Sequence, residues 1–259
     1  CHAAGYQVSV LNPARVAFYA RSRLSRTKQD HVDSALIAQF LVSEQPQLWQ
    51  PLPPAYYELQ ELVRRLDDLK AMRQQERNRL KAGITSRTVQ GSVQEHITLL
   101  DQRITALEQQ IHEHINHDPD LRTRRDLLES IPGIAALTAA KLLGECGDLT
   151  RFVSAPALAA YAGLCPQHHE SGTSVHKRTR LCRTGHGGLR KALYFPALSA
   201  MRHNPILKAF ADRLHAAHKT KMQIVAAVMR KLLHLAFGVV KSNRPFDPNF
   251  LAHRHAALA

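Results

Sequence analysis

Acidic residues are absent from one long stretch of this sequence. No aspartate or glutamate occurs between Glu170 and Asp212, although eight lysines and arginines do. Residues 1–170 are neutral, whereas residues 171–259 carry sixteen basic side chains against two acidic ones. The whole formal net charge of +14 therefore lies in the last third of the chain, a distribution typical of a surface that binds a polyanion.

The sequence also lacks paired cysteines, long apolar runs and aromatic amphipathic segments, and each absence excludes a class of protein. The four cysteines form no CxxC pair, so we predict no disulfide framework and a reducing, cytoplasmic setting. No run of about 18 apolar residues occurs, so we expect no membrane span. No amphipathic segment pairs bulky aromatic residues with basic ones as a membrane-surface helix does. Nucleic acid is therefore the expected polyanion.

The beginning of the chain has the composition of a β-strand. The run from Gly5 to Leu11 reads as a strand that ends at Asn12-Pro13. No second convincing strand follows, and a lone strand needs a sheet to pair with. Because residue 1 is Cys rather than Met, we expect a fragment whose sheet partners lie upstream of Cys1.

Two acidic residues share a face of the next predicted helix, which runs from Asp30 to about Val42. Asp30 and Asp33 are three residues apart, so they lie side by side on a helix. One interpretation is that they complement the positive end of the helix dipole. The other is that they are two ligands for Mg²⁺ in a phosphoryl-transfer site, which would need further acids from upstream.

After a linker over residues 44–54 that contains four prolines, two apolar seams predict a pair of long helices. A break is expected from Gly83 to Gly91. The spacing favours either an antiparallel hairpin packed within one chain or a coiled coil that joins two chains. The seam residues are Leu59, Leu62, Leu66 and Leu69, then Ile97, Leu100, Ile104, Leu107 and Ile111.

A helix-hairpin-helix pattern occupies about residues 121–145. Its turn is Ile131-Pro132-Gly133-Ile134, between helices predicted at 121–130 and 134–144. In this motif the backbone N–H groups of the turn and of the following helix bind a phosphate without reading the bases. Pro132, Gly133 and Ile134 are therefore candidate nucleic-acid contacts, although an ordinary helical turn has the same appearance.

Residues 161–191 combine a hydroxyl, glycines and dense positive charge. Ser171 stands beside Gly172 and is a candidate nucleophile, and a helix that Pro196 should kink or split follows Gly187-Gly188. Cys165, His168, Cys182 and His186 approach the spacing of a zinc site, but sixteen histidines make chance matches easy. The candidate phosphate contacts are Lys177, Arg178, Arg180, Arg183, Arg190 and Lys191.

The ordered set of motifs resembles the insertion-sequence 110/1111 transposases, also called DEDD transposases, which include the Piv-type DNA invertases. The resemblance covers nearly the whole chain. The matching text is Gly5-Tyr-x-Val-x-Val-x-Asn12-Pro13, Thr27-Lys28-x-Asp30-x-x-Asp33, Leu62-Val-Arg-Arg-Leu66, Ser130-Ile-Pro-Gly-Ile134, Ala159-Ala-Tyr-Ala-Gly-Leu164-x-Pro166, Ser171-Gly172 and Leu189-Arg190.

The resemblance implies a RuvC-like (RNase H-type) domain in which four acidic residues bind Mg²⁺. Asp30 and Asp33 match the last two of the four, and the first Asp and the Glu would lie upstream of Cys1. Ser171 matches the nucleophilic serine of the family's second domain. The family also implies a structured guide RNA as a partner besides DNA, in the bacterial cytoplasm at the nucleoid.

We therefore predict a mainly α protein of three parts. Residues 1–50 would be the C-terminal remnant of the α/β RuvC-like domain, and residues 55–117 a coiled-coil hairpin that joins two copies of the chain. Residues 121–250 would form a helical C-terminal transposase domain that contains the helix-hairpin-helix and the serine region at 161–191.

The predicted function is that of an insertion-sequence transposase, which binds DNA and cleaves and rejoins it through Ser171 with Mg²⁺. An alternative is a catalytically inactive fragment that only binds nucleic acid, because a serine next to a glycine is often a turn residue. A coiled-coil scaffold is a third interpretation, but it leaves the charge of +14 unexplained.

Overall fold

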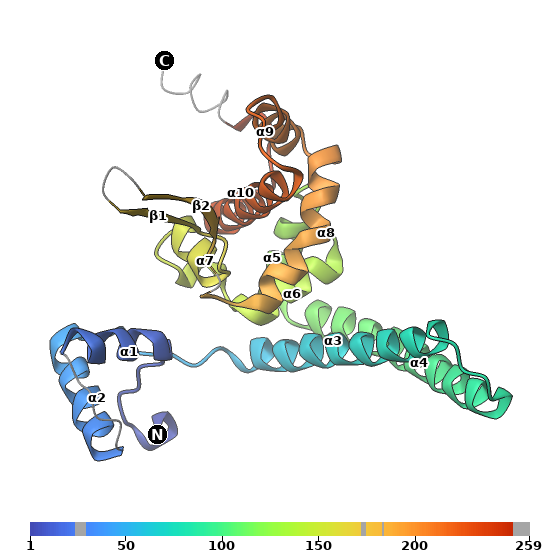
Figure 1. Cartoon of the computed structure of the whole chain (residues 1–259), viewed down its shortest axis with the longest axis horizontal. Helices are drawn as coiled ribbons and strands as arrows, with labels where there is room; N and C mark the ends of the chain where they lie inside the picture. Colours follow the sequence, from blue (N-terminus) through green and yellow to red (C-terminus); the bar gives the residue numbers. More distant parts are fainter. Residues whose placement is uncertain (24–29, 172–174, 183, 251–259) are drawn as a thin grey trace. The chain divides into compact units, whose positions relative to one another are not determined.

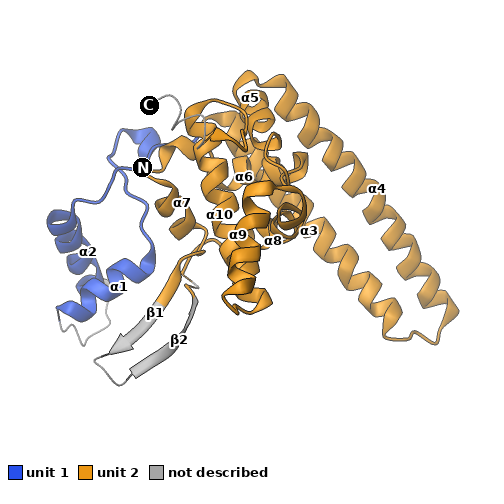
Figure 2. Ribbon diagram, turned by 90° about the horizontal axis from the view of Figure 1, so that it is seen from above, with its two compact units in different colours: residues 1–52 blue, residues 53–259 orange. Residues whose placement is uncertain are grey.

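The structure of the chain, a computed structural model, is mainly helical: its described residues form ten α-helices and one pair of β-strands (Figure 1). It describes residues 1–23, 30–171, 175–182 and 184–250, with the backbone alone for residue 30 and for residues 168–171 and 175–180. The chain divides into two compact units, Cys1–Leu52 and Pro53–Ala259 (Figure 2). The division falls within the proline-rich linker that the sequence predicts.

The first unit contains a short 3-10 turn, η1 (His2–Ala4), and two helices, α1 (Pro13–Ser22) and α2 (Asp30–Glu44). The side chain of Asn12 accepts a hydrogen bond from Ala14 N, and Pro13 takes the first helical position, so Asn12-Pro13 begins α1. The two helices meet where Tyr19 contacts the buried ring of Phe40 edge to face, with the ring centroids 5.3 Å apart.

The strand predicted from Gly5 to Leu11 is wrong. In the described part of unit 1 no strand forms. The backbone of this run is joined to a distant segment by the hydrogen bond from Trp49 N to the Val8 carbonyl, at 2.7 Å. A strand needs a neighbour to satisfy its backbone groups, and no neighbouring strand is present here. The α/β remnant expected for residues 1–50 is accordingly helical in the residues described.

The second unit begins with two long antiparallel helices, α3 (Pro54–Lys81) and α4 (Arg87–His117), which we call the arm (Figure 1). The apolar seams predicted from sequence face each other within one chain, with Val63 more deeply buried than Leu62. The break between the helices is shorter than expected, because Ser86 caps α4 and Gly91 lies inside it. The buried apolar seam residues are Leu59, Val63, Leu66, Leu69, Ile97, Leu100, Ile104, Leu107, Ile111 and Ile115.

The rest of unit 2 is a helical core built around α10 (Lys221–Ser242), which packs against four other helices. By length and composition α10 alone among the described helices could cross a membrane, but 56% of its most apolar window is buried inside the protein, as in a core helix. The surrounding elements are α5 (Pro119–Glu129), α6 (Ala136–Cys146), η2 (Leu149–Arg151), α7 (Ala155–Tyr161), α8 (Gly187–His203) and α9 (Pro205–Ala216).

We predicted that Pro196 would kink or split the helix that follows Gly187-Gly188; the split is wrong, because α8 continues through Pro196. Pro196 is buried, and the helix is uninterrupted from Gly187 to His203. A proline inside a helix removes one backbone hydrogen bond. Packing of the buried neighbours Leu193 and Ala197 against the core offsets that loss.

A β-hairpin is the element that sequence analysis missed. Strands β1 (Pro166–Ser171) and β2 (Val175–Leu181) pair antiparallel, with an irregularity between Gln167 and His169. Neither sequence alternates apolar with polar residues, so the usual strand signal is absent. The two strands are close in sequence, so they can pair through backbone hydrogen bonds. Such pairing does not require alternating apolar residues.

Candidate nucleic-acid interface

The predicted nucleophile lies at the end of the β-hairpin. Ser171 is the last residue of β1, and its backbone pairs with that of Val175, the first residue of β2. The residues between the two strands, 172–174, lie outside the described part of the chain, as does Arg183. Ser171 therefore lies at the end of β1 that adjoins the connection between the two strands. The two strands extend from the helices of unit 2 (Figure 1).

Three of the predicted phosphate contacts lie on the strand that pairs with the serine strand. The backbone of Lys177 is opposite that of His169, Arg180 is opposite Gln167, and Arg178 lies between them on β2. The side chains of Ser171, Lys177, Arg178 and Arg180 are outside the described residues. The register thus places a basic strand beside the strand that ends in Ser171.

The base of the hairpin is closed by glycines in close contact. Gly163 has a φ of +67°, and a Cβ on Gly185 would lie 2.5 Å from Gly163 N and 2.9 Å from the Tyr161 carbonyl. The Arg190 guanidinium donates to the Ala162 carbonyl at 3.1 Å and covers Gly163. Arg190, predicted as a phosphate contact, therefore also holds the hairpin base in place, whereas its neighbour Lys191 is exposed.

His186 joins the segment after β2 to three other elements. Its N–H donates to the Tyr161 carbonyl at 2.7 Å, and its Nδ1 accepts from Leu189 N at 3.2 Å, which caps α8. Its Nε2 lies 3.3 Å from Oε2 of Glu145, a half-buried carboxylate at the end of α6. Arg64 of the arm binds the same carboxylate with two nitrogens, at 3.1 and 2.8 Å.

Tyr161 completes this cluster. Its ring stacks on His186 with centroids 5.9 Å apart, and its hydroxyl donates to the Glu145 carbonyl at 3.3 Å. Burial raises the pKa of the Tyr161 phenol, with the Cys146 thiol and the Glu145 carboxylate adding to the effect. The phenol is therefore a neutral donor, and Arg64, Glu145, Tyr161 and His186 form one continuous polar cluster from the arm to the hairpin base.

The turn of the predicted helix-hairpin-helix packs against α8. Gly133 has a φ of +109°, and a Cβ there would lie 2.6 Å from the Cβ of Ala200. Ile134 is buried, and its N–H donates to the Ile131 carbonyl at 2.9 Å. Pro132 is half-buried, with its carbonyl 3.5 Å from Nδ2 of Asn204. The three predicted contacts thus lie together, and the backbone N–H of Ile134 has an internal partner.

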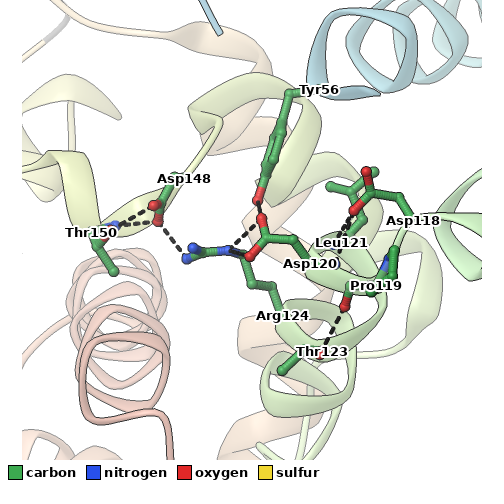
Figure 3. Close-up of polar contacts among 9 residues, drawn as sticks. All are labelled: Tyr56, Asp118, Pro119, Asp120, Leu121, Thr123, Arg124, Asp148 and Thr150. Atoms are coloured by element: carbon green, nitrogen blue, oxygen red, sulfur yellow. Dashed lines mark hydrogen bonds and ion pairs between the residues drawn. The ribbon is translucent and has the colours of Figure 1, made fainter. Parts of the chain in front are cut away.

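A partly exposed polar network fixes the start of the arm on the core (Figure 3). The Tyr56 hydroxyl of α3 donates to Oδ2 of Asp120 on α5 at 2.6 Å. Arg124 donates to both Asp120, at 2.9 Å, and Asp148, at 2.5 Å. Asp148 in turn accepts from the backbone and hydroxyl of Thr150. The arm, α5 and the η2 turn are therefore held together by directional bonds.

Protonation equilibria reflect this network. Burial, helped by the hydrogen bond to Asp120, raises the pKa of the Tyr56 phenol far above its usual range. Burial opposes ionisation of Asp120, but hydrogen bonds from Arg124 and Tyr56 outweigh it and lower the pKa of that carboxyl. The phenol is thus held neutral and the carboxyl ionised, the combination that their hydrogen bond requires.

The predicted metal ligands lie in the first unit. Asp30 is the first residue of α2, with its side chain outside the described residues, and Asp33 follows one turn later, half-buried. Among the described residues no three His, Cys, Asp or Glu side chains gather as a metal site requires, which also covers Cys165, Cys182 and His186 of the zinc interpretation. His168 of that set lies outside the described side chains.

Sequence reasoning missed the residues that support the serine hairpin. The capping role of His186 had a signal, because His186 directly precedes the Gly187-Gly188 start of a helix. Glu145 and Arg64 had none, since they are 81 residues apart in sequence and meet only through the packing of α3 on α6. That packing is close: a Cβ on Gly144 would lie 2.9 Å from the Val63 side chain.

Comparison with known proteins assigns the chain to a family. A family model described as Transposase IS116/IS110/IS902 family matches residues 125–212, and a transposase model of the DEDD type from IS110 elements matches residues 1–87. The first match runs from α5 to α9 and includes the β-hairpin with Ser171. The second covers unit 1 and α3 of the arm.

Individual relatives extend the match along the chain. The pilin gene-inverting protein of Moraxella bovis is 39% identical over 243 residues, which cover 93% of this chain and 75% of that protein. The homologous protein of Moraxella lacunata gives the same figures. The insertion element IS110 43.6 kDa protein of Streptomyces coelicolor is 31% identical over 156 residues, 60% of this chain and 37% of that protein. The chain belongs to the IS116/IS110/IS902 family of insertion-sequence transposases and recombinases.

Proposed function

We propose that this recombinase cuts and rejoins DNA through a covalent intermediate on Ser171, with Mg²⁺ held by Asp30 and Asp33. The observation that carries the proposal is the position of Ser171. It ends a strand whose partner strand bears Lys177, Arg178 and Arg180, inside the segment that matches the transposase family. A hydroxyl at the tip of a basic hairpin can approach a phosphodiester.

The chemistry consists of two balanced transfers. The Ser171 oxygen attacks phosphorus, an Oγ–P bond forms, and the bond to one sugar oxygen breaks as that oxygen leaves and takes up a proton. A hydroxyl of the partner strand then attacks the phosphoserine, and the serine oxygen leaves and regains its proton. Because each step exchanges one phosphodiester for another, rejoining needs no high-energy cofactor.

The acidic pair fits a share of a magnesium site. Mg²⁺ prefers carboxylate oxygens and is often bound by one or two carboxylates together with waters and substrate phosphates. Asp30 and Asp33, one helical turn apart, supply that number of carboxylates. The metal, when bound, stabilises charge on the phosphate and lowers the pKa of a bound hydroxyl or water.

Binding to DNA is backbone-driven in this proposal. The basic third of the chain neutralises strand phosphates, and the backbone N–H of Gly133, in the turn before α6, adds a further phosphate contact. If about six phosphates are contacted, the slope of log affinity against log salt on duplex DNA is roughly −5, at about −0.9 for each phosphate. A slope near zero between low and moderate salt contradicts this mode of binding.

A guide RNA is part of the proposal because the family resemblance implies one, and a phosphate-binding surface accepts either nucleic acid. Arg183 and Arg190 belong to the same basic stretch. The measurement is electrophoresis of the purified protein with its element's RNA, with and without ribonuclease. Loss of DNA cleavage on ribonuclease treatment supports guidance, and unchanged cleavage contradicts it.

The serine mechanism is tested by trapping the covalent intermediate. The protein, expressed with the whole reading frame that encodes it, is incubated with Mg²⁺, guide RNA and donor DNA, and denaturing gels detect protein–DNA adducts. Ser171→Ala should abolish the adduct and leave DNA binding nearly unchanged. Asp33→Asn should also abolish the adduct, and chelation of Mg²⁺ should reproduce its effect.

The neighbouring hydroxyl Ser174 provides the matched control. Ser174→Ala should keep the adduct, because Ser174 does not match the family's serine. An adduct that survives Ser171→Ala but is lost in Ser174→Ala would identify the other hydroxyl as the nucleophile. An adduct that neither substitution affects contradicts the serine mechanism and favours a protein that only binds nucleic acid.

A further inference from the structure

One exposed stripe of α8 combines a bare aromatic ring with two cations. At 100° per residue, Lys191, Phe195 and Arg202 lie within about 40° of one another around the helix. They span about 16 Å along its axis, at about 1.5 Å per residue. All three side chains are exposed, whereas Leu193 and Ala197 on the opposite face are buried in the core.

Phe195 is 75% exposed, and no other large apolar side chain of α8 is exposed. It contacts the half-buried ring of Tyr194 at 5.3 Å between centroids and an interplanar angle of 81°. An edge-to-face contact of this kind fixes the plane of a ring at little cost in exposed area. Phe195 is therefore an isolated, solvent-exposed ring and not part of an apolar patch.

The charge around this ring has one sign. Neither Lys191 nor Arg202 has a carboxylate within ion-pairing distance in the part of the chain that the structure describes. They belong to the stretch between Glu170 and Asp212 that contains no acidic residue. Bringing a phosphate to either cation thus displaces no internal partner.

We propose that Phe195 stacks on an unpaired DNA base, while Lys191 and Arg202 bind the phosphates on either side of it. Aromatic rings flanked by cations are how proteins hold single strands, since every base has a face to stack and every nucleotide has a phosphate. A base inside a duplex is already stacked on both faces, so the ring selects unpaired strands. The inference rests on the proposed function, because strand exchange on DNA creates such strands.

A protein or lipid partner fits this stripe less well. Docking surfaces for apolar partners are contiguous patches of several hundred square ångströms. On α8 a single exposed ring lies between two charges. Charge complementarity therefore favours a nucleic-acid strand. Because the chain belongs to a transposase family, we assign that strand to DNA rather than to RNA.

The test compares matched single-stranded and duplex DNA oligonucleotides of one sequence, with affinity for the 259-residue chain measured by fluorescence anisotropy. Phe195→Leu, which keeps an apolar side chain but removes the ring, should weaken single-strand binding at least about fivefold. Duplex binding should change less than about twofold. Phe195→Trp should bind single strands as tightly as the wild type or more tightly.

Two further variants separate stacking from charge. Lys191→Gln should make the salt slope for single strands less steep by about 0.7, whereas Phe195→Leu should leave that slope unchanged. Val153→Ala removes another exposed apolar side chain, 83% exposed and outside the stripe, and should change neither affinity nor slope. Thermal unfolding of each variant checks that the fold is retained.

Failure of the stacking proposal and failure of the proposed function give different results. Single-strand affinity that Phe195→Leu leaves unchanged overturns the stacking proposal, as does an equal loss on duplex DNA. A single-stranded RNA oligonucleotide of the same sequence is measured alongside, and a loss by Phe195→Leu on that RNA but not on the DNA strand overturns the assignment to DNA. If the wild-type chain binds neither form of DNA, or binds without salt dependence, the proposed function itself fails, which is a different result from failure of Phe195 alone.

Discussion

The arm and the C-terminal helices differ in how their charges are arranged. In the arm, cations lie against carboxylates: Lys70 Nζ is 2.7 Å from Glu108 and Arg73 Nη1 is 2.5 Å from Asp101. On α8, α9 and α10, no lysine or arginine has a carboxylate within ion-pairing distance among the described residues. Both regions consist of charged helices, but only the C-terminal helices carry positive charge that no carboxylate compensates among the described residues.

That difference distinguishes charge that is neutralised within the fold from charge that is available to a polyanion. Exposed ion pairs contribute only about 0–1 kcal/mol each, so those of the arm chiefly keep its surface neutral and soluble. Uncompensated cations repel one another, which costs stability that a bound polyanion restores. The C-terminal helices therefore have a physical reason to bind nucleic acid, and the arm does not.

The largest expected effect comes from removing charge on the serine hairpin. Lys177→Ala, Arg178→Ala and Arg180→Ala together should lower duplex DNA affinity about 10²- to 10³-fold near 0.1 M salt and make the salt slope less steep by roughly 2.7. Salt titrations by anisotropy measure both values. The three side chains would each neutralise one phosphate.

The matched control removes three cations of the arm. Lys70→Ala, Arg73→Ala and Arg77→Ala should change DNA affinity less than about twofold, because the carboxylates Glu108 and Asp101 already compensate these charges. Equal losses from the two triple variants would mean that net charge alone governs binding. The distinction between the regions would then be wrong.

A pair of glycine substitutions should show how differently the core and the arm are packed. Gly133→Ala should lower the free energy of unfolding by about 2–4 kcal/mol, because its φ is +109° and its Cβ would meet the backbone and Cβ of Ala200. Gly91→Ala should instead raise it by about 0.5–1 kcal/mol, since Gly91 is helical and exposed with nothing within 4 Å. Urea unfolding monitored by circular dichroism measures both.

Equal destabilisation by the two substitutions contradicts the packing described for the turn. The Gly133→Ala variant also bears on the helix-hairpin-helix, since the turn would move away from α8. DNA affinity measured below the unfolding transition would then fall with it if the turn binds phosphate, and would stay constant if the turn only packs.

The parts of the fold that sequence predicted are those with apolar periodicity. The arm, α2 and α10 carry seams with helical spacing, and Asn204-Pro205 marks the start of α9, where the Asn204 side chain accepts from Ile206 and Leu207. The strand from Gly5 to Leu11 was predicted wrongly because a strand needs a neighbouring strand for its backbone hydrogen bonds as well as a suitable composition. The β-hairpin was missed because backbone pairing leaves no periodic trace in a polar sequence.

The candidate site was predictable as a set of residues but not as an arrangement. Ser171 and its cations follow from charge and from the family resemblance. The glycine contact between Gly163 and Gly185 depends on two segments that meet in space, and the Arg64–Glu145–His186 contacts depend on three. Local sequence carries no information on such meetings, so the supporting cluster emerged only from the structure.

The predicted self-association of the arm must use residues other than its apolar seam, because the seam is buried within one chain. Leu66 and Leu107 are buried between α3 and α4, so lysine at either position would unfold the arm instead of testing a dimer. A dimer would use exposed apolar side chains of the arm, and Met72, Val89 and Leu99 are 40–50% exposed. Leu99→Lys should therefore lower the mass measured by light scattering at tens of micromolar protein and leave unfolding nearly unchanged. A wild type that is monomeric there makes the arm intramolecular only.

The smallest expected effect concerns pH at the junction of the arm and the core. The pKa of Asp120 is lower in the folded protein than its ordinary value of about 3.9. Its contribution to stability is therefore fully present above about pH 4 and is lost as pH falls through the folded-state pKa. The pKa of Tyr56 is raised, so its contribution is present below about pH 10 and is lost as pH rises further.

Tyr56→Phe should remove the alkaline part of this dependence, and Asp120→Asn the acidic part, with each losing about 1 kcal/mol of unfolding free energy at pH 7 through the broken hydrogen bond. Urea midpoints from pH 3 to 11 measure the profiles. Tyr57→Phe is the control, because Tyr57 is exposed on the neighbouring position of α3. If Tyr56→Phe and Tyr57→Phe give the same profile, the hydrogen bond to Asp120 does not couple the arm to the core. The arm would then depend for its placement on the contacts of α3 with α6, through Gly144 and Arg64.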